Sequence, residues 1–280
     1  MIWLMIAAAL LLAAIVFLIV RGNTRPVLRE YTVSAPDLPR EADGMRIVQV
    51  SDLHNAVPGG SGRLLHILRQ ARPDLIALTG DLFDARRKRG HGKALGLAVE
   101  AVKIAPCYWI MGNHEARLPD GEELAEALAA CGVTVLRNES RTLLPGLILR
   151  GVDDPALRTD DPREEAAVME AQLAAFPRDG FSVLLSHRPE CFELYVRYGA
   201  DLVLTGHAHG GQWRFPGAGG LFAPRQGLFP RYDGGLYADG RTVMIVSRGL
   251  GNSLFPFRLF NPPEAVAVTL HKNGQDEKTE

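Results

Sequence analysis

Residues 45–84 read MRIVQVSDLHNAVPGGSGRLLHILRQARPDLIALTGDLFD, and this stretch decides the fold. Two apolar runs, at 45–50 and 75–79, each lead into polar residues, and residues 61–74 between them carry apolar side chains at helical spacing. A strand, a helix and a second strand in this order predict a parallel βαβ unit, because parallel strands need a long crossover connection. An α/β sheet is therefore expected to begin here.

The same alternation continues through most of the chain. Further helices are expected at 92–105, 121–132, 162–176 and 190–201. Further strands are expected at 107–115, 133–138, 143–154, 181–189, 202–211, 241–252 and 265–272. The sequence shows no internal repeat and no second-domain boundary, so we expect one α/β domain over residues 43–272 and a solvated tail at 273–280.

The N-terminus has a different composition. Residues 2–20 carry no charged side chain. A segment of this length, folded as a helix, is about long enough to cross the hydrocarbon core of a bilayer. We expect an uncleaved, single-pass anchor over residues 1–21, because a cleaved signal peptide, the alternative, would show a basic start and a small-residue cleavage site. Residues 22–42 are expected to be a juxtamembrane linker with one strand at 28–35.

Basic residues follow this helix and none precedes it. Arg21, Arg25 and Arg29 lie on its C-terminal side, so positive-inside reasoning places the domain in the cytoplasm, at an inner or plasma membrane. The whole chain of 280 residues has a formal net charge of −1, which disfavours nucleic acid as a partner. We expect a monomer.

The three cysteines are widely spaced along the chain. Cys107, Cys131 and Cys191 form no CxxC pair and are odd in number. Neither a disulfide framework nor a thiolate zinc site is therefore indicated, and we expect small core residues.

Five of the expected strands each end in residues that could bind a metal ion. These residues are Asp52 and His54, Asp81, Asn113 and His114, His187, and His207 and His209. An Asp or Asn ahead of a helix is often only a cap, and a single histidine at a strand end is usually an ordinary surface residue. The carboxyl ends of strands in an open α/β sheet line one crevice, however, so five such clusters predict a shared site.

The donor types favour two divalent ions. Carboxylates, imidazoles and one amide oxygen, without a thiolate, suit Mn, Fe or Zn, whereas calcium or magnesium would not need so many imidazoles. Two ions about 3.5–4 Å apart can share a carboxylate, polarise a phosphoryl oxygen and activate a water for in-line attack. The residues therefore indicate metal-dependent hydrolysis.

The order of these motifs resembles a known family. DLH at 52–54, GDLFD at 80–84, GNHE at 112–115, SH at 186–187 and GHAH at 206–209 look like the motif series of the calcineurin-like metallophosphoesterases. The later stretches GHAHGGQWRFP, YDGGLY and SRGLGNSLFPFRLFNPPE resemble the small membrane-anchored bacterial branch, with its transmembrane metallophosphoesterase relatives. The resemblance implies a four-layer α/β/β/α sandwich with the site on one rim, preceded here by one transmembrane helix.

The resemblance also implies a role for each residue of the shared site. It assigns Asp52, His54 and His209 to a first metal ion, Asp81 to both ions, and Asn113, His187 and His207 to a second. His114 would protonate the leaving group or hold a phosphoryl oxygen. Asp84 would orient His114 through a hydrogen bond, as carboxylates beside functional histidines do.

Three glycines stand directly before these residues. Gly80, Gly112 and Gly206 occupy positions where a side chain would crowd the metal ions or block a tight turn. The alternative is that each is an ordinary turn glycine.

The chain departs from the protein-phosphatase branch at one position. That branch follows its second acid with an arginine that holds phosphate, and Ala85 stands there in this chain. The change argues against phosphoprotein substrates and is compatible with phosphodiesters or pyrophosphates. The following Arg86, Arg87 and Lys88 are expected to form a solvated loop; the alternative is that they touch an anionic substrate.

These observations favour a membrane-anchored, dinuclear phosphoesterase acting on a phosphodiester or pyrophosphate. By family analogy its substrate could be lipid-linked, such as a UDP-diacylglucosamine or a phospholipid. Several aromatic residues could then form an apolar lip for acyl chains, or simply pack in the core: Trp213, Phe215, Phe222, Phe229 and residues 255–257. The alternatives are a tethered phosphodiesterase for a soluble or cell-wall substrate, and a non-catalytic metal-stabilised scaffold, which would be expected to lack His114 or a ligand.

Overall fold

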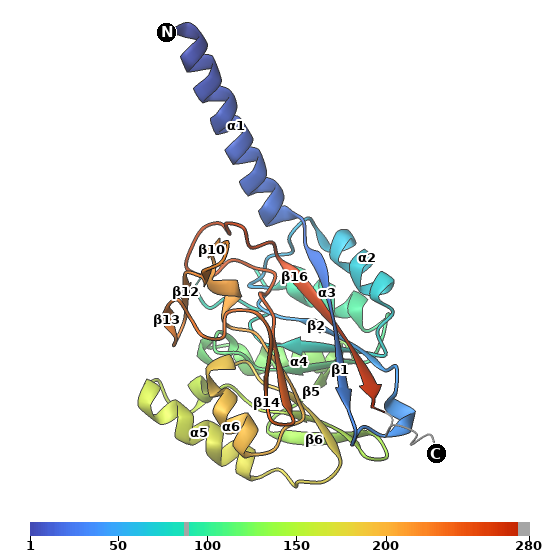
Figure 1. Ribbon diagram of the computed structural model, residues 1–280. Coiled ribbons are helices and arrows are strands. Elements are labelled where there is room, and N and C mark those ends of the chain that lie inside the picture. Colours follow the sequence, from blue (N-terminus) through green and yellow to red (C-terminus); the bar gives the residue numbers. More distant parts are fainter. Residues whose placement is uncertain (87–89, 274–280) are drawn as a thin grey trace, which may run out of the picture.

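The computed structural model describes residues 1–86 and 90–273, and two six-stranded sheets lie at its centre (Figure 1). The first sheet has the order β1 (Val27–Ala35), β16 (Glu264–Lys272), β2 (Arg46–Val50), β3 (Leu75–Thr79), β4 (Cys107–Ile110) and β5 (Thr134–Val135). The second has the order β14 (Gly235–Asp239), β15 (Thr242–Val246), β9 (Leu202–Thr205), β8 (Phe181–Leu185), β7 (Leu147–Gly151) and β6 (Glu139–Leu144).

Helices cover the outer face of each sheet. The first sheet packs against α2 (Ser61–Ala71), α3 (Gly92–Ala101) and α4 (Gly121–Ala130), and the second against α5 (Pro162–Ala174) and α6 (Phe192–Arg197). The short 3₁₀ helices are η1 (Arg40–Ala42), η2 (Glu115–Arg117), η3 (Pro155–Leu157), η4 (Pro189–Cys191) and η5 (His209–Gly211). Four short strands, β10 (Arg214–Phe215), β11 (Gly219–Gly220), β12 (Phe222–Ala223) and β13 (Gly227–Leu228), form two hairpins. The expected four-layer α/β/β/α sandwich is confirmed.

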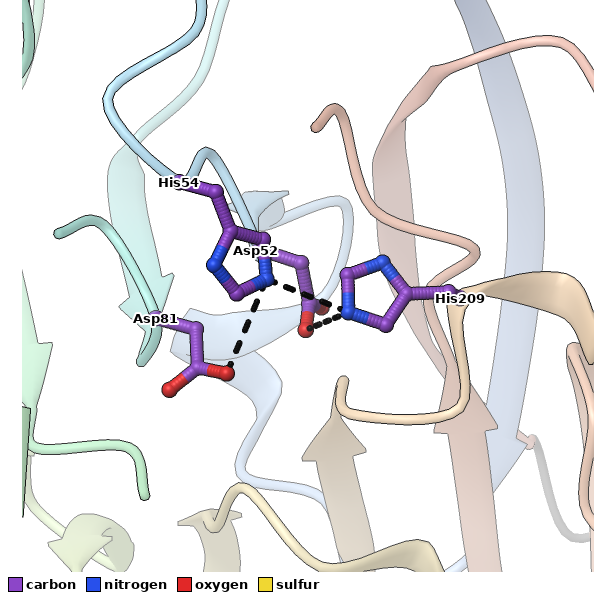
Figure 2. Close-up of side chains that lie close together, drawn as sticks. All are labelled: Asp52, His54, Asp81 and His209. Atoms are coloured by element: carbon purple, nitrogen blue, oxygen red, sulfur yellow. Dashed lines mark hydrogen bonds and ion pairs between the residues drawn. The ribbon is translucent and has the colours of Figure 1, made fainter. Parts of the chain in front are cut away.

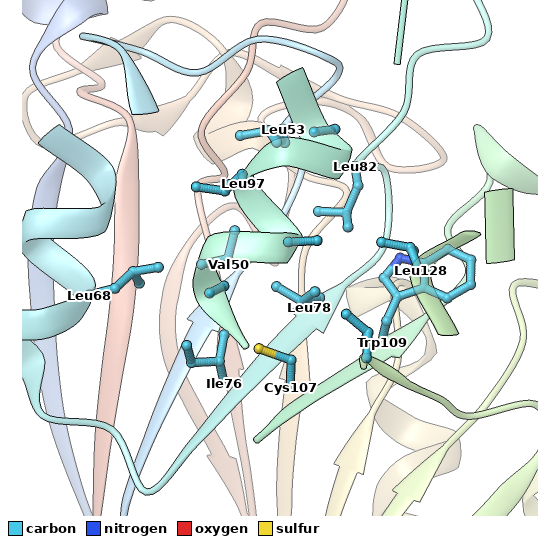
Figure 3. Packing of buried hydrophobic residues seen from close by; sticks show 14 of the residues in the cluster. Val50, Leu53, Leu68, Ile76, Leu78, Leu82, Leu97, Cys107, Trp109 and Leu128 are labelled. Carbon is cyan, nitrogen blue, oxygen red and sulfur yellow. The ribbon is translucent and has the colours of Figure 1, made fainter. Parts of the chain in front are cut away.

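Three apolar clusters hold these layers together. One lies between the sheets and includes Ile47 and Val183, which are fully buried. A second joins the first sheet to its helices through residues such as Leu68 and Trp109 (Figure 3). Strands buried on both faces read as continuous apolar runs, which is why 75–79 could be recognised in the sequence.

Local signals explain where the helices begin and end. Leu64, Leu68 and Ala71 lie on the buried side of α2, at the spacing of one helical face. The helix ends at Arg72, which adopts a left-handed conformation (φ 47°) directly before Pro73. The carboxylate of Asp161 caps α5 by accepting a hydrogen bond from the Arg163 N–H.

The sheets are not purely parallel, which the βαβ pattern alone did not predict. β16 is antiparallel to β2, because it enters the first sheet through the long connection that follows β15 rather than through a crossover helix. The expected strand at 143–154 is divided between β6 and β7, which pair as an antiparallel hairpin. The chain reverses at Gly146, whose φ of +80° favours glycine.

The segment expected as a linker, 22–42, contributes to the first sheet. Its strand β1 pairs with β16 in parallel over nine residue pairs, from Val27 with Glu264 to Ala35 with Lys272. The strand expected at 28–35 within the linker is therefore present as β1, and it belongs to the sheet. Of the expected solvated tail, only Asn273 lies within the described residues.

Helix α1 (Ile2–Thr24) projects away from the sandwich (Figure 1). Its most apolar stretch has a mean hydropathy of 3.0 and is not buried by the rest of the described chain. At 1.5 Å per residue, 23 residues extend about 34 Å, which is enough to cross a bilayer. By length and composition the helix qualifies as a membrane span, as an N-terminal signal sequence also would.

Candidate metal centre

The carboxyl ends of five strands bring the expected site residues together. β2, β3 and β4 of the first sheet lead to Asp52, Asp81 and Asn113, whereas β8 and β9 of the second lead to His187 and His207. All seven expected ligands are buried. The two sheets thus contribute to one site, although the residues come from distant parts of the chain.

Asp52, His54, Asp81 and His209 form the first donor group, and their side chains point toward one another (Figure 2). The Nε2 atoms of His54 and His209 are 3.1 Å apart. His209 Nε2 lies 3.3 Å from Asp52 Oδ1, and His54 Nε2 lies 3.7 Å from Asp81 Oδ2. Two imidazole nitrogens bound to one metal ion at about 2.1 Å would be separated by about 3.0–3.4 Å, so this spacing suits a shared ion.

Asp81, His187 and His207 form the second donor group. His187 Nε2 lies 3.2 Å from Asp81 Oδ2, the same carboxylate oxygen that faces His54. His187 Nδ1–H donates to the carbonyl oxygen of Thr79 at 2.8 Å, which fixes the ring with Nε2 facing Asp81. Asp81 is therefore common to both donor groups.

Asn113 lies on the loop that contacts Asp81. It follows β4, and the backbone N–H of the next residue, His114, donates to Asp81 Oδ1 at 2.8 Å. Among the described residues, Asn113 Oδ1 and His207 Nε2 are buried side-chain atoms that find no hydrogen-bond partner. An unpaired buried polar atom costs about 1–3 kcal/mol, so both atoms suit positions of metal ligands.

The backbone at the site is strained. Asp52, His54, Asp81, His207 and His209 all have positive φ values, between 49° and 66°. A non-glycine residue pays about 1–2 kcal/mol for this left-handed conformation, and such residues cluster at functional sites. The strained turns direct five donor side chains toward the shared site, and this conformational free energy must be offset by other interactions in the fold.

The glycines ahead of the ligands are required by close approach. A Cβ at Gly206 would lie 2.0 Å from Ser51 Oγ and 2.4 Å from Asp52 Oδ2. A Cβ at Gly112 would lie 2.4 Å from Asp81 Oδ1, and one at Gly80 would lie 2.8 Å from His187 Nδ1. Any side chain at these positions would displace a donor, so they are not ordinary turn glycines.

Burial sets the protonation states of most of the imidazoles. It lowers the pKa of His54 to about 3 and holds those of His207 and His209 well below their usual value. These three side chains are therefore neutral at neutral pH, with lone pairs available for a metal ion.

His187 and Asp81 form an ion pair at the shared position. Burial lowers the pKa of His187, but the carboxylates of Asp81 and Asp52 outweigh it and raise that pKa to about 10. Burial raises the pKa of Asp81, yet the neighbouring His187 and His114 bring it well below its usual value. A proton thus occupies the place where a cation would sit, and a bound cation would displace it. The donor set therefore fits divalent metal ions.

His114 and Asp84 lie at the edge of the first group, within 4.8 Å of a donor atom of His54, and with it they form a third set of possible metal ligands. His114 Nδ1 lies 3.1 Å from Asp84 Oδ1, and its Nε2 lies 3.9 Å from Asp81 Oδ2. Burial lowers the pKa of His114, but the charge of Asp81 and the hydrogen bond that the ring donates to Asp84 raise it overall. The Ala85 N–H also lies 3.0 Å from Nδ1, and it can donate only when that nitrogen carries no proton. The raised pKa favours the protonated ring held by Asp84.

Glu115 is a functional residue that sequence reasoning missed. Its fully buried carboxylate accepts hydrogen bonds from the backbone N–H groups of Asp81, Phe83 and Gly112, each at 2.9 Å. It therefore ties the loop after β3 to the loop after β4. Burial and the charge of Asp81 raise its pKa to about 7. The GNHE motif contains this residue, but nothing local distinguishes it from an exposed acid.

Arg86 is exposed, as expected for a solvated loop, but its side chain also has fixed partners. Its guanidinium lies 3.2 Å from Asp84 Oδ1 and donates to Ser253 Oγ at 3.2 Å, and its side chain is about one third exposed, at 32%. It therefore forms part of the rim beside His114. Arg87 and Lys88 lie outside the described residues.

Comparison with known proteins agrees with this geometry. A family model described as calcineurin-like phosphoesterase matches residues 45–211. The chain is 30% identical over 250 residues to the metallophosphoesterase YkuE of Bacillus subtilis, covering 86% of this chain and 84% of that protein. It is 33% identical over 208 residues to the phosphodiesterase YaeI of Escherichia coli, covering 72% of each chain. A zebrafish (Danio rerio) transmembrane protein with a metallophosphoesterase domain is 27% identical, covering 94% of this chain and 62% of that protein.

A solved structure shares the fold. The protein TT1561 of Thermus thermophilus matches with a TM-score of 0.52 and 14% identity, covering 74% of this chain and 90% of that chain. At this identity the likeness concerns the arrangement of sheets and helices.

Proposed function

The chain belongs to the calcineurin-like phosphoesterase family and is a metal-dependent phosphohydrolase, and we propose that it uses two divalent ions to hydrolyse a phosphodiester or pyrophosphate bond beside a membrane. The observation that carries the proposal is the position of Asp81. One carboxylate lies between two groups of buried histidines, which is the arrangement that a pair of metal ions requires.

Each side chain then has a role in binding the ions. Asp52, His54 and His209 would hold the first ion, His187, His207 and Asn113 the second, and Asp81 both. The carboxylate and imidazole donors suit Mn, Fe or Zn. Bound ions of this kind would neutralise phosphoryl charge and supply a nucleophile by lowering the pKa of water.

His114 and Asp84 would serve the leaving group. A protonated His114 beside the first donor group can give its Nε2 proton to the departing oxygen, while Asp84 fixes the ring through Nδ1. The rim cation Arg86 adds positive charge near the same position. These residues would therefore assist departure of the leaving alkoxide or phosphate.

A diester or pyrophosphate is proposed rather than a phosphoprotein. Ala85 supplies no side-chain donor at the position where the protein-phosphatase branch has its phosphate-binding arginine. The Escherichia coli relative is named a phosphodiesterase, which supports the same class.

We also propose that α1 is a single-pass anchor, that the domain lies in the cytoplasm beside an inner or plasma membrane, and that the substrate is lipid-linked. A phosphatase reporter fused after residue 30 should be inactive; an active fusion would reverse that orientation.

Hydrolysis of model esters tests the proposal. Full-length protein loaded with Mn²⁺ should cleave bis-p-nitrophenyl phosphate with a kcat/KM at least about tenfold above that for p-nitrophenyl phosphate, a difference of about 1.4 kcal/mol in transition-state binding. A chelator should abolish turnover, and added Mn²⁺ should restore it. Chelator-resistant hydrolysis would contradict the metal requirement, and a preference for the monoester would contradict the substrate class.

A further inference from the structure

Residues 253–260, here called the 253–260 loop, expose apolar side chains beside the foot of α1. Leu254 is 62% exposed and Phe260 is 69% exposed, and Pro256 between them is also exposed. Figure 1 shows this red-brown part of the chain, between β15 and β16, passing close to the lower end of α1. Large apolar side chains that are exposed together usually mark a contact surface.

The loop is held firmly, so its exposed side chains are not the result of loose packing. Its other side stacks on Trp213, whose ring centroid lies 5.0 Å from that of Phe255 and 5.4 Å from that of Phe257. The buried guanidinium of Arg258 donates to the carbonyl oxygens of Arg248 and Gly251. Phe260 itself has a φ of 50°, a left-handed conformation that a phenylalanine rarely adopts, and it presents its ring outward.

A pair of hydrogen bonds joins the loop to the end of α1. The Arg258 N–H donates to Asn23 Oδ1 at 2.7 Å, and Asn23 Nδ2 donates to the Arg258 carbonyl oxygen at 2.9 Å. Asn23 lies in the last turn of α1. Because about 20 apolar residues of a helix span the hydrocarbon core, this last turn would lie at the boundary of the bilayer. The loop residues next to Arg258 therefore lie at the level of the lipid headgroups if α1 spans the bilayer.

The same edge of the molecule carries the candidate metal centre. β1 begins three residues after α1 and runs parallel to β16, and β16 is antiparallel to β2, so the carboxyl end of β2 lies at the α1 end of the sheet. Contacts confirm this placement. The Gly251 N–H donates to the Asp52 carbonyl oxygen at 2.6 Å, and Asn261 Nδ2 donates to that of His209 at 2.7 Å. The residues that flank the 253–260 loop on both sides thus touch metal-ligand loops.

Charge and space at this edge suit a lipid surface. Arg21, Arg25 and Arg63 are exposed around the foot of α1, where they can meet anionic headgroups. A hollow of about 580 Å³ lies between the foot of α1 and the ligand loops, with Asn23, Lys93 and Gly251 in its lining. A bilayer interface would accommodate this combination of an apolar loop, a basic rim and an open hollow.

We propose that the 253–260 loop lies on the bilayer that holds α1, with Leu254 and Phe260 inserted among the headgroups and upper acyl chains. The proposal rests on the anchoring role of α1 proposed above. It places the metal centre at the membrane-proximal edge, with the hollow available to a lipid headgroup. A substrate embedded in the bilayer would then reach the metal ions without leaving the membrane surface.

Depth measurements on the full-length chain in liposomes test this placement. Cys131 and Cys191, which are partly exposed, are first replaced by serine. A nitroxide label is then attached at Leu254→Cys or Phe260→Cys, and its collisions with oxygen, which concentrates in the bilayer, are compared with those of a water-soluble nickel complex. His271→Cys is the matched control, because His271 is exposed and lies near the far end of the nine-residue β16, about 25 Å from its start. Leu11→Cys, in α1, reports the anchor itself.

The ratio of the collision rate with oxygen to that with the nickel complex should be at least about fivefold higher for labels at 254 and 260 than for the label at 271. The label at 11 should give a higher ratio still. Equal nickel access at 254, 260 and 271, with a deep label at 11, would overturn the proposal and leave the anchor standing. A water-exposed label at 11 would instead contradict the anchor. Each labelled protein must still hydrolyse the soluble diester, which confirms that it is folded.

Discussion

Asp81→Asn should reduce diester hydrolysis by at least about 10³-fold. A bound metal ion stabilises the transition state by several kcal/mol, and each tenfold in rate corresponds to about 1.36 kcal/mol of activation free energy. The substitution preserves the size of the side chain and removes the negative charge. That charge faces His187 Nε2 at 3.2 Å and His54 Nε2 at 3.7 Å, so both donor groups lose it together. Steady-state kinetics with bis-p-nitrophenyl phosphate, with metal analysis of the same sample, measure the effect.

Asp74→Asn provides the matched control. Asp74 stands immediately before the other end of β3, where its carboxylate accepts a hydrogen bond from the Arg46 N–H at 2.7 Å. The same chemical change there should leave turnover within about twofold of the unsubstituted protein, as expected for a surface substitution. Undiminished turnover in Asp81→Asn would refute the assignment of Asp81 as the shared ligand.

His114→Ala should lower kcat by about 10²–10⁴-fold, the range expected for loss of a general acid, while the metal content stays unchanged. His114 Nε2 lies 3.9 Å from Asp81 Oδ2 and its Nδ1 is held by Asp84, so it faces the site without joining either shared donor group around Asp81. The loss should be larger for substrates with alkyl leaving groups, which need a proton, than for p-nitrophenyl esters. Comparing the two substrate types separates proton donation from general structural damage.

His66→Ala is the control for this substitution, since His66 is exposed on α2 away from the site. It should change neither kcat nor metal content. A large loss of metal in His114→Ala would show that His114 is itself a ligand. An equal loss of kcat for both kinds of leaving group would count against the general-acid role.

The sequence predicted which residues come together better than it predicted the order and direction of the strands that carry them. Asp52, Asp81 and His207 could be placed on one rim because each follows an apolar run, and the carboxyl ends of such strands meet at one edge. The left-handed turns that aim these residues inward have no comparable signal, since Asp and His occupy that conformation in only a few places and no sequence pattern marks them.

Features that depend on distant contacts were not predictable. The pairing of β1 with β16 joins the two ends of the domain, and neither strand's own pattern indicates the partner. Glu115 accepts hydrogen bonds from backbone N–H groups of two loops, and its residue type alone does not reveal these contacts. The 253–260 loop lacks any regular periodicity, and its importance lies in hydrogen bonds to Asn23 and to the ligand loops.

The central claim is that this site holds two ions joined by Asp81, and metal counting with electron paramagnetic resonance tests it most directly. Full-length protein loaded with Mn²⁺ and freed of excess metal should contain two Mn²⁺ per chain and give the spectrum of a spin-coupled pair. Asp81→Asn should lose that coupling. A fully active protein with a single, uncoupled Mn²⁺ per chain would contradict the account.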